Sequence, residues 1–195
     1  MTNVRPENLE IGGANEAAAT AVPCVLMNVF DAVRTLLAVR RFKDQAIPDE
    51  VVSRIVEAGR LTASANNRQP WHFVVVRNRD RLRELGKLVK TGPYIADAPL
   101  AIAVAYDKAS PLAVSDASRA IQSMMLTAWD DSVGSNWTGF RGLDEVAKFL
   151  AIPSELDVLA VLPFGYPAQT VGRGVKQRKP LREVASLEQY GQPFE

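Results

Sequence analysis

Apolar residues recur at helical spacing in several parts of the chain. A run after Pro48, which suits the first position of a helix, places four apolar residues on one face, Val51, Val52, Ile55 and Val56. Similar stripes predict three further helices, over residues 79–89, 115–128 and 143–150. Ser115 is expected to cap the second of these, because its hydroxyl can accept a backbone N–H of the first turn. An earlier helix is expected to end at the cations Arg40 and Arg41.

Three uninterrupted apolar runs predict β-strands, over residues 71–76, 100–106 and 158–162. The run from Trp71 to Val76 is rich in β-branched residues, and we expect it to be buried on both faces of a sheet. Strands that alternate with helices in this way favour an α/β or α+β sandwich built on one sheet.

Residues 1–27 follow neither period. This segment is rich in Ala, Asn, Gly and Glu, and acidic residues occupy the positions where a signal peptide would be basic. We interpret residues 1–27 as a disordered extension, or as the product of an upstream start with Met27 as the true one. The remaining residues, 28–195, are expected to form one folded domain.

Charge and composition exclude several classes of protein. With 23 basic and 22 acidic residues the formal net charge is +1, whereas proteins that grip nucleic acid or anionic membranes carry a larger basic excess. The longest uncharged stretch, residues 17–30, is too short to span a bilayer. A single cysteine, Cys24, excludes an internal disulfide and fits a reducing cytoplasm. A single histidine, His72, excludes a metal site built from several imidazoles.

The motifs of the common catalytic machineries are missing. The chain has no glycine fingerprint for dinucleotides, no phosphate loop and no nucleophile elbow. His72 lies in a predicted buried strand and is expected to be a satisfied core histidine, while Cys24 lies in the extension. We therefore expect no catalytic side chain and no metal, and an organic cofactor that carries the reactivity.

Four segments combine cations, amides, small residues and aromatics as a cofactor site would. They are Val39-Arg-Arg-Phe42, Thr62-Ala-Ser-Ala-Asn-Asn-Arg-Gln-Pro-Trp71, Val133-Gly-Ser-Asn-Trp-Thr-Gly-Phe140, and Phe164-Gly-Tyr-Pro167 with the basic run 173–182. Taken singly, each has a plainer interpretation: Arg40 with Arg41, or the basic run, would be solvated surface charge. Their combination favours a site.

The order and content of these segments resemble the nitroreductase family of FMN-dependent NAD(P)H oxidoreductases. The similarity extends over about residues 28–194, and its motifs are Asn67-Arg-Gln-Pro-Trp71, Gly134-Ser-Asn-Trp137 and Lys176-Gln-Arg-Lys-Pro-Leu181. The resemblance implies an α+β fold, a nitroreductase-like three-layer α/β/α sandwich with a mainly antiparallel sheet. It also implies a domain-swapped homodimer, with a long helix at the interface, a C-terminal arm around the partner and two FMN molecules between the subunits.

Carried over by position, the resemblance assigns a set of cofactor-binding residues. Small and amide residues of the segment 62–71 would approach the flavin from the partner subunit: Ala63, Ser64, Ala65, Asn67 and Gln69. Thr138 and Gly139, beside Trp137, would present backbone N–H groups near flavin N5 and O4. Lys176 and Arg178 would hold the phosphate, and Arg40 would lie against the N1–O2 edge. Elementary electrostatics agrees, because a guanidinium near N1 stabilises the anionic reduced flavin.

The chain departs from the family pattern before Arg40. Where the family carries an Arg-x-Ser pair that holds the phosphate, this chain has Leu36 and Ala38. Charged hydrogen bonds of that kind contribute roughly 1.5–3 kcal/mol each. We expect Arg34, Arg173 or Lys179 to compensate, or FMN to bind more weakly.

The resemblance implies hydride transfer from NADH or NADPH to flavin N5, followed by reduction of a nitroaromatic, quinone or activated alkene in the same pocket, a ping-pong mechanism. Two alternatives remain open. One is another family reaction, such as dehalogenation, flavin fragmentation or the use of a deazaflavin. The other is a non-catalytic dimeric flavin-binding protein with a weakened phosphate site. The physiological acceptor and the preference between NADH and NADPH stay open.

Overall fold

The computed structural model describes residues 27–169 and 176–194. Nearly all of the predicted N-terminal extension, including Cys24, lies outside the described residues, as does Arg173 of the basic run. Among the residues described, no helix is both long and apolar enough to cross a membrane.

Four antiparallel strands form one sheet, in the order β1-β2-β4-β3. The central strands β2 (Leu100–Asp107) and β4 (Leu156–Gly165) are almost entirely buried. They carry the second and third predicted strands, and the two-residue strand β3 (Gly134–Ser135) adds an edge that the sequence did not indicate.

The first predicted strand, β1 (Trp71–Val76), forms at the other edge of the sheet. Its expected burial on both faces is wrong, because an edge strand has a neighbouring strand on one side alone. Val75 is 40% exposed, and His72 is exposed rather than a core histidine. The pairing of β1 with β2 nevertheless fixes the start of this strand, where Trp71 lies opposite Tyr106.

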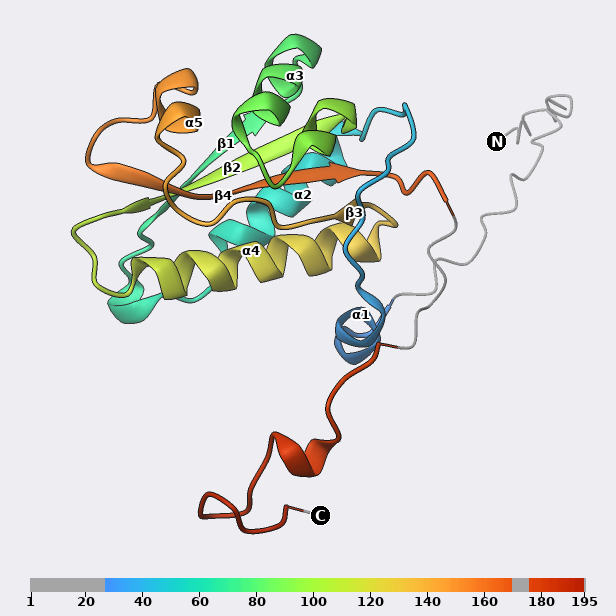
Figure 1. The fold of residues 1–195 in the computed structure, drawn as a ribbon, viewed down its shortest axis with the longest axis vertical. Helices are drawn as coiled ribbons and strands as arrows, with labels where there is room; N and C mark the ends of the chain where they lie inside the picture. The colour runs from blue at the N-terminus through green and yellow to red at the C-terminus, as the bar shows by residue number, and fades with distance from the viewer. Residues whose placement is uncertain (1–26, 170–175, 195) are drawn as a thin grey trace, which may run out of the picture.

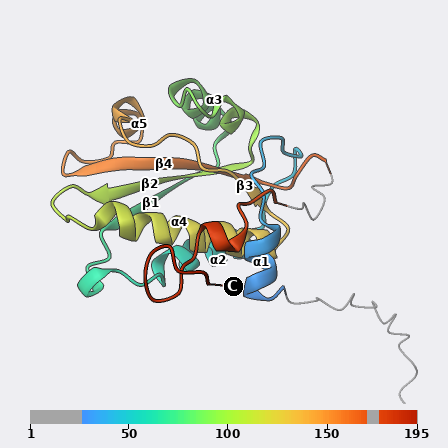
Figure 2. The ribbon, with the colours of Figure 1, turned by 60° about the horizontal axis from the view of Figure 1, so that its bottom comes forward.

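Helices cover both faces of the sheet and give three layers (Figures 1 and 2). Helices α2 (Asp49–Arg60) and α4 (Ala113–Asp130) pack on one face, where Ile55, Ile121 and Met124 are fully buried against residues of β2 and β4. Helices α3 (Arg79–Leu88) and α5 (Asp144–Phe149) pack on the other face. This arrangement confirms the three-layer α/β/α sandwich with an antiparallel sheet.

Helix α4 begins earlier than the sequence suggests. Leu112 is its N-cap residue, and the backbone N–H of Asp116 already donates to the Leu112 carbonyl oxygen at 2.9 Å. Ser115 therefore lies within the first turn and does not cap the helix. The apolar stripe of this helix was predicted correctly, but the stripe alone does not mark the first residue.

The N-terminal helix α1 (Val29–Thr35) is capped by the side chain of Asn28, which accepts the Asp31 N–H at 2.8 Å. It ends five residues before Arg40, so the expectation that this helix reaches Arg40 and Arg41 is wrong. The chain instead continues along the sheet edge: the Val39 N–H donates to the Ser135 carbonyl oxygen at 2.9 Å, beside a parallel bridge between Ala38 and Ser135.

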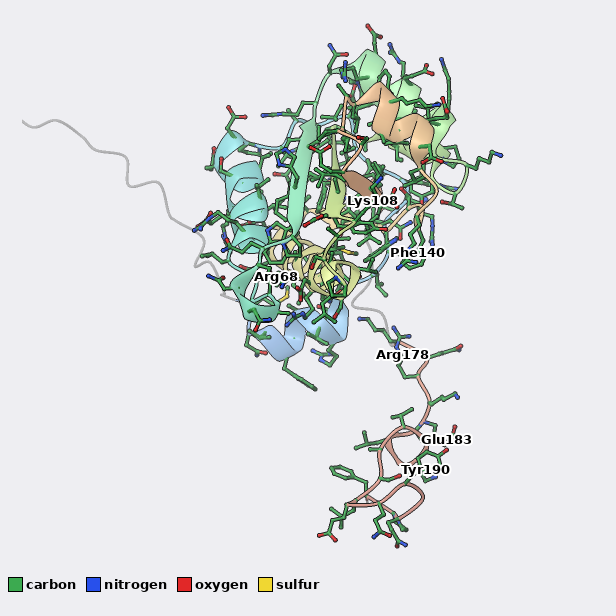
Figure 3. All side chains as sticks on the ribbon, turned by 90° about the vertical axis from the view of Figure 1, so that its left-hand side faces the viewer. Arg68, Lys108, Phe140, Arg178, Glu183 and Tyr190 are labelled. Carbon is green, nitrogen blue, oxygen red and sulfur yellow. The ribbon has the colours of Figure 1, made fainter. Side chains whose placement is uncertain are left out.

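Residues 176–194, which we call the C-terminal arm, stand away from the three-layer body (Figures 1 and 3). The arm carries one 3₁₀ turn, η3 (Leu181–Glu183), and a bridge between Ser186 and Pro193. Its apolar side chains are exposed in the single chain: Leu181 by 54%, Val184 by 64% and Leu187 by 53%. Exposed apolar residues in such a row leave considerable apolar surface uncovered.

Candidate functional site

A cavity of about 740 Å³ lies between helix α1, the chain that follows it, helix α4 and the start of the C-terminal arm. We call it the α1–α4 cavity. Its wall holds three cations, Arg34, Lys176 and Arg178. The remaining wall is mostly apolar and includes Val33, Leu36, Leu37, Ala38 and Met125. The structure thus brings together Lys176 and Arg178, the two cations that the sequence assigned to one phosphate.

Lys176, the first residue of the C-terminal arm, is held by a hydrogen bond to helix α1. Its side-chain Nζ donates to the carbonyl oxygen of Val33 at 2.6 Å. Burial lowers the pKa of the Lys176 ammonium, and the neighbouring charge of Arg178 lowers it further. Both effects disfavour the charged ammonium. An anion bound in the cavity would favour the ammonium and so offset both effects.

The other two cations of the wall differ in how they are held. Arg34 forms an ion pair with Asp31, one helical turn before it, with 2.7 Å between Nη2 and Oδ1. Arg178 is exposed, and its Nη1 donates to the carbonyl oxygen of Gln177 at 2.8 Å. That contact leaves other guanidinium N–H groups of Arg178 available to a ligand.

Leu36 and Ala38 line the same cavity as the cations. Their side chains carry no hydrogen-bond donor, so the two positions at which the chain departs from the family pattern contribute only apolar surface. Beside Ala38 lies Ser135, which is fully buried and whose Oγ has no hydrogen-bond partner among the described residues. The wall therefore fits a ligand that combines an anionic end with an apolar body.

The loop after β3 is tightly bonded to its surroundings. The Thr138 N–H donates to the Val161 carbonyl oxygen at 3.2 Å, and the Gly139 N–H donates to Thr91 Oγ1 at 2.9 Å. The indole Nε1 of Trp137 donates to the Gly139 carbonyl oxygen at 2.7 Å. In the single chain, the two N–H groups that were expected to face flavin N5 and O4 thus have protein partners, and their approach to the flavin stays a prediction.

The predicted amide-rich segment, residues 62–69, forms a compact turn around η1 (Ala65–Asn67). Asn66, Asn67 and Gln69 have φ angles of 51°, 53° and 50°, in the left-handed region. The Ser64 hydroxyl accepts the Gln69 N–H at 2.9 Å and so closes the turn. Its small side chains, including those of Ala63 and Ala65, are exposed or half-buried at the surface of the single chain.

The turn at residues 62–69 and helix α1, which borders the cavity, lie near different ends of α4 (Figures 1 and 2). The centre of the turn meets the helix at Asp116, whose carboxylate accepts the Ala65 N–H, and the first residue of the turn, Thr62, contacts Ser123. The cavity touches the helix at Gln122 and Met125. At a rise of about 1.5 Å per residue, Asp116 and Met125 are separated by roughly 14 Å along the helix. Within one chain, the residues of the turn do not line the α1–α4 cavity.

Arg40 lies outside the α1–α4 cavity. It lines a separate depression of about 380 Å³ together with Arg41, Phe42 and Arg79. No ion pair of Arg40 is found within residues 27–169 and 176–194, whereas Arg79 is paired with Asp44 at 3.2 Å. Because residues 38–42 run past the edge of the sheet, Arg40 lies on the chain just beyond the cavity wall formed by Ala38.

Two residues near the predicted segments were not assigned a role from the sequence. Thr91 binds the Gly139 N–H, and nothing in the pattern around Thr91 indicates this contact. Asp116 could have been noticed in the sequence, because it interrupts the apolar stripe of α4. In the structure it is only 1% exposed. An acidic residue at a buried helical position requires a partner and is therefore a signal.

Comparison with known proteins agrees with the fold. The profile of the nitroreductase family matches residues 37–109 and 89–166. A provisional NADH dehydrogenase/NAD(P)H nitroreductase of Methanothermobacter thermautotrophicus is 34% identical over 154 residues, which cover 75% of this chain and 81% of the relative. A solved structure with the same provisional description, from Bacteroides thetaiotaomicron, is 27% identical with a TM-score of 0.76 and covers 83% of this chain and 97% of its own.

A further solved structure, an FMN-dependent nitroreductase of Clostridium difficile, also has a TM-score of 0.76 and covers 83% of this chain and 99% of its own. At 22% identity that likeness shows the fold alone. The matched family profile spans the strands, helix α4 and the loop after β3. The chain belongs to the nitroreductase family.

Proposed function

We propose that this chain is an FMN-dependent oxidoreductase that takes hydride from NADH or NADPH and reduces a small acceptor. The observation that carries the proposal is the meeting of Lys176 and Arg178 in the α1–α4 cavity, beside an apolar wall, in a member of the nitroreductase family. FMN combines a phosphate with a flat ring, which suits a wall of cations and apolar side chains.

Lys176 and Arg178 would hold the phosphate, and Arg34 is the third cation of the same wall. The Arg178 guanidinium can offer two parallel N–H groups to phosphate oxygens, while Lys176 acts as a point charge. Leu36 and Ala38 would pack against the apolar part of the cofactor and contribute no donor. Arg40, just beyond the cavity, is the cation available to the N1–O2 edge.

When bound, FMN supplies the hydride chemistry at its N5 atom, so no side chain needs to act as an acid or a base in this proposal. The protein binds and orients the ring and leaves one face open to the nicotinamide and then to the acceptor. Nitroaromatics, quinones and activated alkenes are the acceptor classes that we propose. The two substrates would use the same face in turn, as a ping-pong mechanism requires.

The site would be completed by a second copy of the chain. Within one chain no residue of the turn at 62–69 lines the cavity, and we assign these residues to the cofactor bound by the partner subunit. The C-terminal arm, with Leu181, Val184 and Leu187 exposed, provides the apolar surface that a partner would cover. A homodimer with two sites, each shared between subunits, satisfies both observations.

The test is a visible absorption spectrum of the purified protein, recorded before and after saturation with FMN and desalting. A retained flavin spectrum, with NADH or NADPH oxidation in the presence of menadione or nitrofurazone, supports the proposal. A variant lacking both cations, Lys176→Ala with Arg178→Ala, should lose the flavin. Lys179→Ala should keep it, because Lys179, one of the cations expected to compensate for Leu36 and Ala38, does not line the cavity. Wild-type protein that stays colourless and oxidises neither donor would refute the proposal.

Leu36 and Ala38 favour a second candidate, a dimer that binds flavin weakly and does not catalyse. A deazaflavin-using member of the family is also compatible with these two positions. Thermal denaturation separates them, because a ligand of the native state raises its stability by RT ln(1 + [L]/Kd). Stabilisation by FMN without turnover favours the binding protein, and stabilisation by a deazaflavin alone favours the specialised enzyme.

A further inference from the structure

A buried carboxylate lies in the first turn of helix α4. Asp116 is 1% exposed and interrupts the apolar stripe formed by Ala113, Ala117 and Ala120. A carboxylate in such surroundings is strongly unfavourable unless its oxygens are hydrogen-bonded. The contacts of its two oxygens therefore show what this residue does for the protein.

The two oxygens of Asp116 have different partners. Oδ2 accepts the backbone N–H of Ala65 at 3.1 Å, and Oδ1 accepts a hydrogen bond from the Arg119 guanidinium, which lies one turn along the helix and is 52% exposed. Arg119 neutralises the carboxylate from the solvent side. Asp116 thereby joins the helix to the backbone of the turn at residues 62–69.

That turn needs external support. Three of its non-glycine residues have backbones in the left-handed region: Asn66, Asn67 and Gln69. Such conformations are unfavourable for these residue types and persist only when their surroundings fix them. The first residue of the turn makes a second contact with α4, because Thr62 Oγ1 lies 2.8 Å from Ser123 Oγ. The bond from Ala65 to Asp116 is the contact at the centre of the turn.

We infer that Asp116 is a positioning residue for the cofactor: it fixes the backbone of the turn at residues 62–69, which reaches the flavin bound by the partner subunit. This inference rests on the proposed function, since it takes FMN as the ligand and assigns the turn to it. Asp116 itself touches no cofactor and acts through the backbone of Ala65. Arg119 supports it by binding the other carboxylate oxygen and so orienting the side chain.

The test compares Asp116→Ala and Asp116→Asn with wild-type protein and with Ser118→Ala as a control. Ser118 is on the same helix, and its hydroxyl donates to the Val114 carbonyl oxygen at 2.7 Å without contacting the turn. Hydrogen exchange of the segment 62–70 measures the turn directly in the cofactor-free protein. Titration with FMN and with riboflavin, followed by flavin fluorescence, measures binding.

In Asp116→Ala, exchange in the segment 62–70 should rise while strands β2 and β4 keep their protection. Loss of a charged hydrogen bond of this kind should weaken binding of FMN and of riboflavin by the same factor, about 10- to 100-fold. Asp116→Asn keeps one acceptor oxygen and should recover part of the protection and of the affinity. The absorption bands of bound flavin should shift in Asp116→Ala and remain unchanged in Ser118→Ala.

The outcomes separate this inference from the proposed function. Wild-type protein that takes up no FMN overturns the proposed function and the role of Asp116 together. If wild-type protein binds FMN and both Asp116→Asn and Asp116→Ala bind it as tightly as wild type, the role of Asp116 is refuted and the proposed function stands. If Asp116→Ala does not fold, Asp116→Asn decides, because unchanged exchange at 62–70 with unchanged affinity refutes the inference.

Discussion

The side-chain ammonium of Lys176 donates to the carbonyl oxygen of Val33 at 2.6 Å and so joins the start of the C-terminal arm to helix α1. Arg178 follows two residues later in the wall of the same cavity, and its charge adds to burial in lowering the pKa of Lys176. The two cations repel each other in the free protein, and a phosphate placed between them would relieve that repulsion.

Lys176→Ala and Arg178→Ala should each weaken FMN binding by about 10- to 100-fold, the effect of losing one charged hydrogen bond of roughly 1.5–3 kcal/mol. Riboflavin, which lacks the phosphate, should bind these variants and the wild type with nearly equal affinity. Lys179→Ala is the matched control, because Lys179 is an adjacent exposed cation of the arm that does not line the cavity. Equal losses for FMN and riboflavin would contradict a phosphate role for these cations.

A mixed dimer tests whether the turn at residues 62–69 acts in the partner's site. One chain carries Asp116→Ala, the other carries Lys176→Ala with Arg178→Ala, and different affinity tags allow the heterodimer to be purified. If each site combines cations of one chain with the turn of the other, one of the two sites is intact and the other carries both defects. We expect about 0.5 FMN per chain for the heterodimer and almost none for either parent homodimer.

A site formed within one chain gives a different result in that experiment. Each chain of the heterodimer would then carry one defect in its own site, and no intact site would exist. A flavin content as low as that of the parents would therefore refute the shared site. A heterodimer of wild-type and Asp116→Ala chains serves as the control and should also retain about half of its flavin.

The order of elements could be predicted from the sequence because each depends on a local period. The helical stripes and the apolar runs are local properties of the sequence. They predicted α2, α3, α4, β2 and β4, all of which the structure contains. The burial of β1 could not be predicted, because the position of a strand at an edge depends on pairing with distant residues. His72 is exposed for the same reason.

The candidate site was predictable in part. The motif at residues 176–181 predicted that Lys176 and Arg178 hold one phosphate, and both residues line the cavity. It could not show that the N–H groups of Thr138 and Gly139 are bound by Val161 and Thr91, because those partners lie far away along the chain. The residues assigned to the site remain a prediction, since binding has to be measured.

Gly134 allows the chain after α1 to approach the sheet. A Cβ atom at this position would clash with Val39 Cγ2, at a distance closer than real side chains come. Gly134→Ala should therefore displace residues 36–39 from β3, lower the free energy of unfolding by about 1–3 kcal/mol and weaken FMN binding. Urea denaturation and flavin titration measure the two effects.

Gly142→Ala provides the comparison for Gly134→Ala. Gly142 has φ +60°, and a Cβ atom there would meet no atom within 4 Å, so its substitution adds backbone strain without a clash. A loss of about 1 kcal/mol with unchanged FMN affinity is expected. If Gly142→Ala weakened FMN binding as much as Gly134→Ala, the close packing of Val39 on Gly134 would not be what shapes the cavity.

The last prediction concerns Asp131, which follows the C-terminal end of α4, where the partial negative charge of the helix disfavours an anion. Its Oδ1 pairs with Arg54 at 2.9 Å, while its buried Oδ2 has no hydrogen-bond partner among the described residues. Burial raises the pKa of Asp131, and nearby Asp130 also raises it, against the opposing effect of Arg54.

A carboxyl group whose pKa is raised by folding binds more protons in the folded than in the unfolded protein. Stability therefore falls as the pH rises from the ordinary pKa of 3.8 through the higher folded value, and the penalty is complete at neutral pH. Asp131→Asn should raise the free energy of unfolding at pH 7 by up to about 1 kcal/mol, because the partly exposed pair with Arg54 contributes little in return. The gain should shrink as the pH falls towards 3.8. Chemical denaturation across this range measures it, with Asp44→Asn, an exposed carboxyl group that pairs with Arg79, as the control. A gain that does not change with pH would refute the assignment to the Asp131 carboxylate.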